Sequence, residues 1–435
     1  MAALGMVVAV GVTGAACSST TSSSTTTTAA GGGSGGSGTS SGRTIPASAF
    51  SDHTGITATT VTVGNVSTLA IGGLFKGALV GTEAAAAYVN STGGVNGRRI
   101  VVVGADDAYS GTGNRLATQN AVNSDAAMVG GFSTFDSFGG QVLAANPGVP
   151  NVTQVLDPAT NKLPNTFSAV PLEGGWELGP LYYFKSKFGP TAIQHTASVV
   201  ADLPSTLADW AGEKYALQQA GYTIVYDQEY ADTQTDFTQN VIAMKNAGVK
   251  VLFIDQMPEA YASALLKDLT QQNFHPEVVL GAAAYTHSLI AASGGPAAVN
   301  GSYLDQNASL YLGEDASSIP AVATFLHWVQ VASPGFKPDL FTLYGWLSGE
   351  LFTQALQNAG KNPSRGSILA ALGKITSFNG DHIVTTSNPV ARTTSNCYLV
   401  GRVVNGQWQR LDDPPIDGPT NGYRCDHAYV TPPSS

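Results

Sequence analysis

Charged residues are scarce in this chain. Asp, Glu, Lys and Arg make up 11% of the 435 residues, and the formal net charge of −10 includes no basic cluster. A protein that binds nucleic acid through its phosphates carries a basic face or stripe. The composition therefore argues against nucleic acid as a partner.

Sequence motifs of catalysis are also absent. The chain has no His-Glu-x-x-His metal motif, no nucleophile elbow and no phosphate-binding loop. Its seven histidines show no close spacing of the kind that zinc ligands need. We therefore expect no cofactor, no metal and no enzymatic activity. A secreted hydrolase whose serine and histidine meet only in the folded chain is the alternative.

No hydrophobic run is long enough to cross a bilayer, which takes about 20 residues. Met1 to Ala16 is apolar and small, as in the hydrophobic region of a secretory signal. The residues from Gly14 to Cys17 resemble a bacterial lipobox, which implies that Cys17 is acylated and begins the mature chain. Gly14 in place of an aliphatic residue and the lack of Lys or Arg before Arg43 depart from that pattern. A disordered tail with a chance cysteine is the alternative.

Ser, Thr, Gly and Ala account for almost all of Ser18 to Gly42. Such a segment cannot bury a core and behaves as a flexible coil, with an end-to-end distance of roughly 25 to 30 Å for its length. We predict a signal sequence over residues 1–17 and a flexible tether over residues 18–56.

Cysteine is rare, with three residues in the whole chain. If Cys17 is an anchor, Cys397 and Cys425 remain as an even number in an exported protein. This favours a disulfide that stabilises the fold by roughly 3 to 4 kcal/mol in the chain-entropy model. Two buried free thiols are the alternative.

After the tether, strand patterns alternate with helix patterns. Val61 to Val66 is β-branched, Phe75 to Asn90 has apolar residues at helical spacing, and Ile100 to Gly104 is an apolar run typical of a parallel strand covered on both faces. The alternation continues to a strand at Val278 to Ala282, and Asn405-Gly406 predicts a late hairpin. The fold class is therefore α/β, with two doubly wound parallel sheets.

Several phrases in this order resemble one known family. They are Tyr88-Val89-Asn90, the run from Gly93 to Arg98, and the strand that ends in Asp106-Asp107. They are similar to the opening of the periplasmic branched-chain amino-acid-binding proteins, the extracytoplasmic solute receptors of ABC transporters, and the similarity extends to about Arg410. The resemblance implies the periplasmic binding protein type I fold, with two lobes joined by three crossovers. We predict the first lobe over residues 57–172 and 304–375, and the second over residues 173–303 and 376–430.

The resemblance also implies a function. The chain is expected to bind a small polar metabolite, such as an amino-acid-like compound, a carboxylate or an amide, between its lobes and to deliver it to an ABC permease. It is expected to act as a monomer, anchored as a lipoprotein to the outer face of the bacterial cell membrane. A ligand sensor without transport is the alternative with the same fold.

Ligands of open α/β sheets bind beyond the carboxyl ends of the strands. Polar and aromatic residues at these ends, with one on a late helix, are the predicted ligand contacts: Thr68, Phe75, Ser133, Thr134, Gln154, Asp202, Gln256, Tyr285 and Tyr344. Each has a structural alternative. Ser133 and Thr134 suit a helix cap, Phe75 and Tyr344 suit a core, and Asp202 suits a surface loop.

Amino-acid-binding members of the family hold the ligand carboxylate with hydroxyls of the first lobe and its ammonium with an acid of the second. Ser133 and Thr134 match the hydroxyls. The position of the acid falls within Gly281 to Ala284, where no carboxylate occurs. An unpaired buried ammonium costs several kcal/mol, and Asp202 is the only substitute that we identify. We therefore predict that leucine, isoleucine and valine bind poorly and that the ligand lacks a free α-ammonium.

Overall fold

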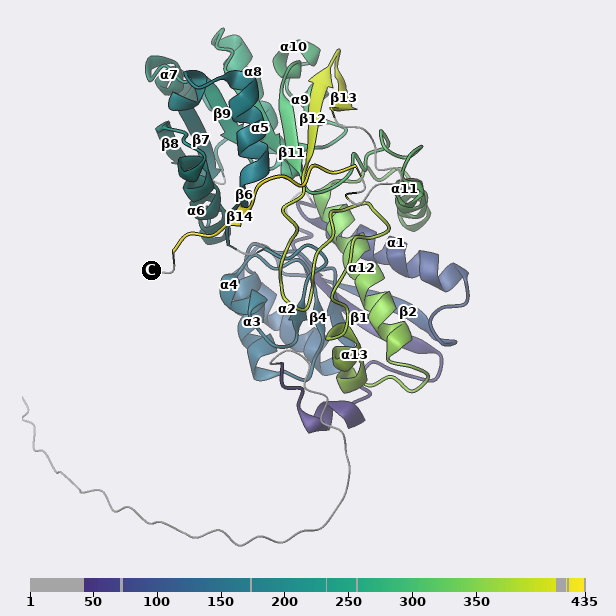
Figure 1. Ribbon diagram of the computed structural model, residues 1–435. Helices are drawn as coiled ribbons and strands as arrows, with labels where there is room; N and C mark the ends of the chain where they lie inside the picture. Colours follow the sequence, from purple (N-terminus) through teal and green to yellow (C-terminus); the bar gives the residue numbers. More distant parts are fainter. Residues whose placement is uncertain are drawn as a thin grey trace, which may run out of the picture. The chain divides into compact units, whose positions relative to one another are not determined.

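The computed structural model describes residues 43–70, 73–172, 174–231, 233–255, 257–411, 420 and 422–433. Cys17 and most of the predicted tether lie outside these ranges. Two large β-sheets with surrounding helices and a small two-stranded sheet make up the described part (Figure 1). None of its helices combines the length and the apolar character needed to span a bilayer.

Residues 43–56, which we predicted as the end of the tether, are folded. They include the 3-10 helix η1 (Ala47–Ser51). The Arg43 guanidinium donates hydrogen bonds to the carbonyl oxygens of Pro164 at 2.9 Å and Thr166 at 2.8 Å. The prediction extended the tether too far because composition does not show where one arginine finds carbonyl partners distant in sequence.

The first sheet has the strand order β2-β1-β3-β4-β5, and all its neighbouring strands are parallel. Its elements alternate as the sequence predicts. The strands are β1 (Thr60–Ser67), β2 (Arg99–Asp106), β3 (Ala127–Val129), β4 (Asn151–Val152) and β5 (Thr166–Phe167), and the helices are α1 (Lys76–Ser91), α2 (Gly111–Ser124), α3 (Asp136–Ala145) and α4 (Pro158–Asn161).

The prediction that β2 is covered on both faces is wrong. This strand lies at the edge of the first sheet, and its Val101 and Val103 side chains are 40% and 46% exposed. The apolar run arises from β-branched residues, which suit a strand whether or not both faces are buried. Only the order of the strands decides which one lies at the edge.

The second sheet has the order β13-β12-β11-β10-β9-β7-β8. Its five strands from β8 to β11 are parallel, and the late hairpin adds β12 and β13 antiparallel to them. The predicted hairpin is thus confirmed. The strands are β7 (Thr196–Ala201), β8 (Ile224–Tyr230), β9 (Val251–Ile254), β10 (Glu277–Gly281), β11 (Tyr303–Gln306), β12 (Leu399–Val404) and β13 (Gln407–Arg410), and the helices are α5 (Leu178–Phe188), α6 (Pro204–Gln219), α7 (Thr238–Asn246), α8 (Glu259–Gln271), α9 (Leu289–Ala292) and α10 (Pro296–Val299).

The chain passes three times between the two sheets. It leaves the first sheet after β5, returns after β11 to helices that pack with the first sheet's helix α1, and leaves again to form β12. Before the chain returns to the first sheet, Tyr303–Gln306 pairs with β10 as strand β11. The returning helices are α11 (Pro320–Ala332), α12 (Leu340–Asn358) and α13 (Arg365–Leu372). The residue limits of the two lobes stay a prediction.

Helix α12 lies alongside α1 (Figure 1) because glycines let their backbones approach. A Cβ atom at Gly81 of α1 would lie 2.0 Å from the carbonyl oxygen of Thr342, and one at Gly345 of α12 would lie 2.1 Å from that of Ala78. Asp339 caps α12 through a hydrogen bond from the Thr342 amide at 2.8 Å. The close packing of α12 on α1 places α12, which carries Phe341 and Tyr344 near its start, next to β3.

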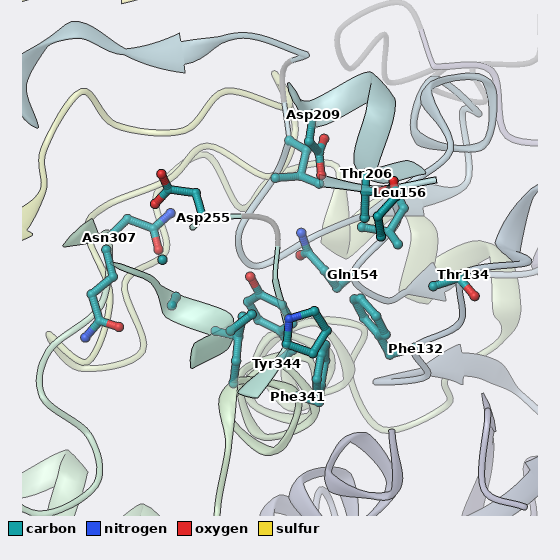
Figure 2. A pocket seen from close by; sticks show the side chains of 18 of the residues that line it. Phe132, Thr134, Gln154, Leu156, Thr206, Asp209, Asp255, Asn307, Phe341 and Tyr344 are labelled. Carbon is teal, nitrogen blue, oxygen red and sulfur yellow. Dashed lines mark hydrogen bonds between the residues drawn. The ribbon is translucent and has the colours of Figure 1, made fainter. Parts of the chain in front are cut away.

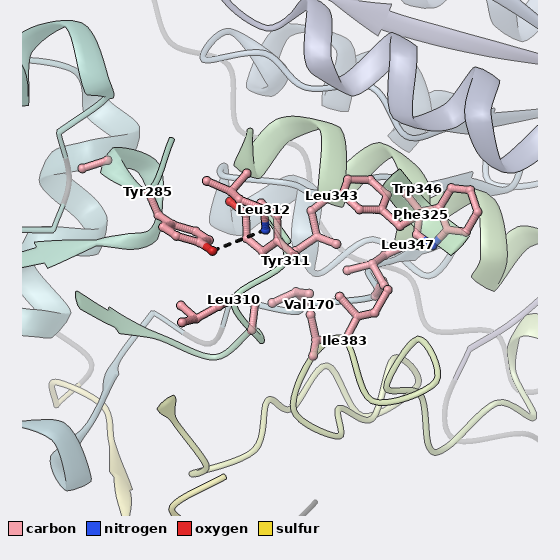
Figure 3. Close-up of a cluster of buried hydrophobic side chains, with 14 of the residues drawn as sticks. Val170, Tyr285, Leu310, Tyr311, Leu312, Phe325, Leu343, Trp346, Leu347 and Ile383 are labelled. Atoms are coloured by element: carbon pink, nitrogen blue, oxygen red, sulfur yellow. Dashed lines mark hydrogen bonds between the residues drawn. The ribbon is translucent and has the colours of Figure 1, made fainter. Parts of the chain in front are cut away.

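A hydrophobic cluster surrounds the second crossover (Figure 3). It includes the fully buried side chains of Tyr285, Tyr311 and Trp346. The Tyr285 hydroxyl donates to a Glu314 carboxylate oxygen at 2.5 Å and accepts from the Leu312 amide at 3.3 Å. Burial of this much apolar surface makes the crossover part of the core.

Candidate ligand-binding site

A cavity of about 240 Å³ lies where strand ends of both sheets meet. Its lining includes Gln154 after β4, Ala201 at the end of β7, Asp255 after β9 and Gly281 at the end of β10. This is the position that open parallel sheets offer to ligands. An apolar cavity of about 150 Å³ holds benzene, so this one suits a somewhat larger small molecule.

Aromatic rings form one wall of the cavity. Phe75 precedes α1, Phe132 follows β3, and Phe341 and Tyr344 lie near the start of α12. The ring centroids of Phe75 lie 4.8 Å from Phe132 and 4.6 Å from Phe341, in edge-to-face contact. Figure 2 shows Phe132, Phe341 and Tyr344 beside one another. This wall offers an apolar surface and ring faces to a ligand.

Two polar side chains of the first sheet's loops adjoin this wall. The Gln154 amide oxygen accepts a hydrogen bond from the Ser168 hydroxyl at 2.7 Å, and in the described part of the chain its amide nitrogen has no partner. Thr134 Oγ1 is buried and likewise finds no partner among the described residues. Both side chains line the cavity. They are therefore available to bond a ligand.

Carboxyl groups form the opposite wall. Asp209 of α6, Asp255 after β9 and Asp305 of β11 line the cavity, and Figure 2 shows Asp209 and Asp255 apart from the aromatic rings. Burial, with the charge of Asp136, raises the pKa of Asp209 to about 7. Burial raises the pKa of Asp255 to about 7 as well. Within the described ranges, no Lys, Arg or His side chain lines the cavity.

The pKa values of Asp305 in this wall and of Glu213, a neighbour of Asp255 outside the cavity lining, are also raised. Burial and the charge of Asp255 raise the pKa of Asp305 well above its ordinary value. Glu213 is 1% exposed, and burial and the neighbouring Asp255 raise its pKa strongly too. One Glu213 carboxyl oxygen has no hydrogen-bond partner in the described part of the chain. The wall thus concentrates acidic groups without a cation of the protein to balance them.

The structure brings four of the nine predicted contacts to the cavity: Phe75, Thr134, Gln154 and Tyr344. Asp202 is exposed and outside the cavity lining, and Gln256 lies outside the described residues. The other three, Thr68, Ser133 and Tyr285, are buried, and none of them lines the cavity. Contact of any of the nine with a ligand stays a prediction.

The hydroxyls of Thr68 and Ser133 bind a carboxylate of the chain itself. Asp107 is fully buried, and its Oδ1 accepts from Thr68 Oγ1 at 2.8 Å and from the Tyr109 amide at 2.9 Å. Ser133 Oγ donates to Asp107 Oδ2, which also accepts from the Asn114 amide group at 3.3 Å. The Ser133 hydroxyl that the resemblance assigned to a ligand carboxylate is therefore already engaged.

Sequence reasoning missed the acidic wall. Asp255 directly follows an apolar strand run, so the strand-end rule that selected Gln256 applies equally to Asp255. Asp305 lies within strand β11 and Asp209 within helix α6, and neither residue has a distinctive sequence signal there. The loop from Gly281 to Ala284 lacks an acid, but the cavity obtains carboxyl groups from other elements. Our reason for excluding an ammonium group from the ligand therefore does not hold.

The predicted disulfide is present. Cys397 and Cys425 are bonded, with their Cα atoms 4.1 Å apart. The segment that they close leads into β14 (Tyr429–Val430), which pairs with β6 (Trp176–Glu177). Residues on both sides of the bridge, Tyr398 and Tyr429, line the cavity. The disulfide therefore fastens part of the cavity wall.

Two α/β lobes with a cavity at their strand ends define a two-lobed solute-binding protein. Comparison with known families agrees, since the model of the periplasmic binding protein family matches residues 60–407. The chain belongs to this family, as a type I member of its branched-chain amino-acid group.

Individual relatives are distant. A Leu/Ile/Val-binding protein homologue of Brucella melitensis is 26% identical over 293 residues, which cover 65% of this chain and 73% of the relative. The fatty acid ABC transporter substrate-binding protein of Thermomonospora curvata has a similar fold, with a TM-score of 0.72 at 16% identity over 88% of this chain and 97% of that one. A solute-binding protein of R. palustris in complex with benzoate gives a TM-score of 0.67 at 16% identity, over 86% and 98% of the two chains.

Proposed function

We propose that this chain is the extracytoplasmic receptor of an ABC importer, binds a small molecule between its two lobes and delivers it to a membrane permease. The observation that carries this proposal is the cavity, whose walls come from strand ends of both sheets. A ligand that contacts both walls stabilises the closed arrangement of two lobes. The receptor acts as a monomer and performs no catalysis.

The relatives support this role. They include a homologue of Leu/Ile/Val-binding proteins, a fatty-acid substrate-binding protein and a solute-binding protein in complex with benzoate. Ligands of such different chemistry indicate that the fold keeps the transport role while the cavity walls set the ligand. Residues 1–17 act as the secretion signal with Cys17 as the lipid anchor, and this places the receptor on the outer face of the cell membrane.

Ser133 is poorly suited to act as a nucleophile. Its hydroxyl donates to the buried Asp107 carboxylate, and the residue lies outside the cavity lining. A nucleophilic serine needs a neighbouring base that takes its proton and a position facing the substrate. These contacts favour binding over hydrolysis.

The test is a thermal-shift screen of ligand-stripped protein against a broad panel of amino acids, amines, carboxylates, amides and sugars. We expect at least one compound to raise the melting temperature and to saturate one site, and the Tyr344→Ala variant to weaken that binding. The control is Tyr88→Ala, at a partly exposed tyrosine of α1 outside the cavity lining. Turnover of an ester or amide panel, or failure of every compound to bind, would contradict the proposal. Permease and ATPase genes beside this one distinguish transport from sensing.

A further inference from the structure

The two walls of the cavity differ in chemistry. One presents the rings of Phe75, Phe132 and Phe341, and the other presents the carboxyl groups of Asp255 and Asp305. A ligand that bridges these walls meets apolar surface at one end and acidic groups at the other. Such a ligand therefore needs an apolar group at one end and a group that suits acidic side chains at the other.

The acidic end has no cation from the protein. The ion pairs of the described residues join other carboxylates, such as Asp227 with Lys214 and Asp315 with Arg410. A buried carboxylate without a cation or sufficient hydrogen bonds is costly. A positively charged ligand group removes that cost, because it brings the missing partner into the cavity. Ring faces of the aromatic wall attract the same kind of charge.

A ligand carboxylate has no comparable place. The Ser133 and Thr68 hydroxyls already donate to Asp107, and no basic side chain of the described residues lines the cavity. A ligand carboxylate beside Asp255, which is ionised above its pKa of about 7, meets a like charge and is repelled. An amino acid therefore satisfies only one of its two charged groups here.

An unpartnered atom in the lining also indicates that the cavity holds a polar ligand. Thr134 lines the cavity, and within the described ranges its Oγ1 has no hydrogen-bond partner. Buried polar atoms of this kind are rare in folded proteins. A hydrogen-bonding group on the ligand provides the missing partner.

We propose that the ligand is an organic cation, in which a protonated amine on a small apolar or aromatic group carries no adjacent carboxylate. The apolar group lies against Phe75, Phe132 and Phe341, and the ammonium group lies against Asp255 and Asp305. This inference rests on the proposed binding function and narrows its ligand to one chemical class. It also separates this receptor from relatives that bear the name of Leu/Ile/Val-binding proteins.

Four probes with one aromatic group and different ends test the proposal on the unmodified chain. They are 2-phenylethylamine with an ammonium only, phenylalanine with both charges, 3-phenylpropionate with a carboxylate only, and the neutral 2-phenylethanol. Titration calorimetry of ligand-stripped protein at pH 8 keeps the amines largely protonated. We expect 2-phenylethylamine to bind at least tenfold more tightly than each of the other three probes.

A pair of variants locates the charged end. Asp255→Asn keeps the shape of the side chain and removes its charge, so the affinity for 2-phenylethylamine should fall at least tenfold while that for 2-phenylethanol is unchanged. The matched control is Glu277→Gln at the exposed start of β10, which should bind like the wild type. If Asp255→Asn does not fold, Asp305→Asn serves the same purpose, and the four-probe comparison needs no variant.

Two results would overturn the ligand class. One is tighter binding of 3-phenylpropionate or phenylalanine than of 2-phenylethylamine, which would leave the proposed receptor function intact. The other is failure of 2-phenylethylamine to bind while some other compound of the broad screen does. If nothing in the broad screen binds, the receptor function itself fails.

Discussion

Gly281 faces the backbone of Asp255 at the ends of neighbouring strands β10 and β9. A Cβ atom at Gly281 would lie 2.5 Å from the Asp255 carbonyl oxygen and 2.7 Å from its Cα atom. Both residues line the cavity. Because Gly281 has no side chain, the Asp255 backbone can lie close to β10. The glycine therefore sets the position of Asp255 in the cavity wall.

The Gly281→Ala variant is expected to shift the backbone at Asp255, because no flexible side chain can give way there. Overpacking of this kind costs roughly 1 to 3 kcal/mol of unfolding free energy. Ligand affinity should fall as well, since Asp255 moves relative to the aromatic wall. Urea denaturation and calorimetry measure the two effects.

The control is Gly148→Ala, where the nearest atom to the new Cβ would be the Ala49 methyl at 3.2 Å. It lies outside the cavity lining and should leave affinity unchanged. Wild-type stability and affinity in Gly281→Ala would show that the strand ends are less tightly packed than this contact indicates.

The Asp107 carboxylate should be one of the most important polar groups of the first sheet. Asp107→Ala removes the acceptor for the hydroxyls of Thr68 and Ser133 and for the Tyr109 amide. Buried donors without an acceptor cost about 1 to 3 kcal/mol each, so we expect a loss of at least about 3 kcal/mol in urea denaturation. Asp107→Asn retains part of the acceptor capacity and should lose less. Equal stability of Asp107→Ala and the wild type would contradict this account.

Local signals in the sequence predicted many elements well. Helix α1 (Lys76–Ser91) differs by one residue at each end from the predicted Phe75 to Asn90, and the hairpin of β12 and β13 follows from its Asn-Gly turn. Both depend on neighbouring residues, whose spacing alone encodes the structure. The strand-end rule likewise found Gln154 and Phe75 in the cavity lining.

Contacts between distant residues could not be predicted in this way. Asp209, Asp255 and Asp305 lie on three different elements, and only the strand order brings them to one cavity. Ser133 had the right residue type at the right strand end, but the partner of its hydroxyl is Asp107, from the loop after another strand. A motif predicts at which strand end a side chain lies, but it does not predict which group that side chain bonds.

Removal of the disulfide should weaken both the fold and the site. Cys397 and Cys425 are 28 residues apart, and a loop of this length is worth about 3 to 4 kcal/mol in the chain-entropy model. The double variant Cys397→Ser/Cys425→Ser should unfold at lower urea concentration. It should also bind ligand less tightly, because Tyr398 and Tyr429 then lose their fixed positions in the cavity wall. Unchanged affinity together with lower stability would limit the bridge to a structural role.

Acylation of Cys17 predicts where the protein is found in cells. Stable membrane attachment takes two acyl chains or an equivalent second signal. The Cys17→Ser variant should therefore move from the membrane fraction to the medium, as measured by immunoblot, while Ser18→Ala stays membrane-bound. If the wild type is already released and carries no lipid by mass spectrometry, the lipobox was misidentified.

Asp209 should make the ligand-free protein less stable as the pH rises from about 4 to 7. Its pKa is about 7 in the folded chain, because burial and the charge of Asp136 disfavour the ionised form, whereas an unfolded aspartate ionises near pH 4. The stability linked to the raised pKa is present below the unfolded value and is lost as the pH passes through the folded value. Asp209→Asn does not titrate, so its stability relative to the wild type should increase by about 3 kcal/mol between pH 4.5 and pH 8. Urea denaturation at the two pH values measures this difference, with Glu277→Gln as the exposed control. A constant difference between Asp209→Asn and the wild type would show that Asp209 ionises freely in the folded chain.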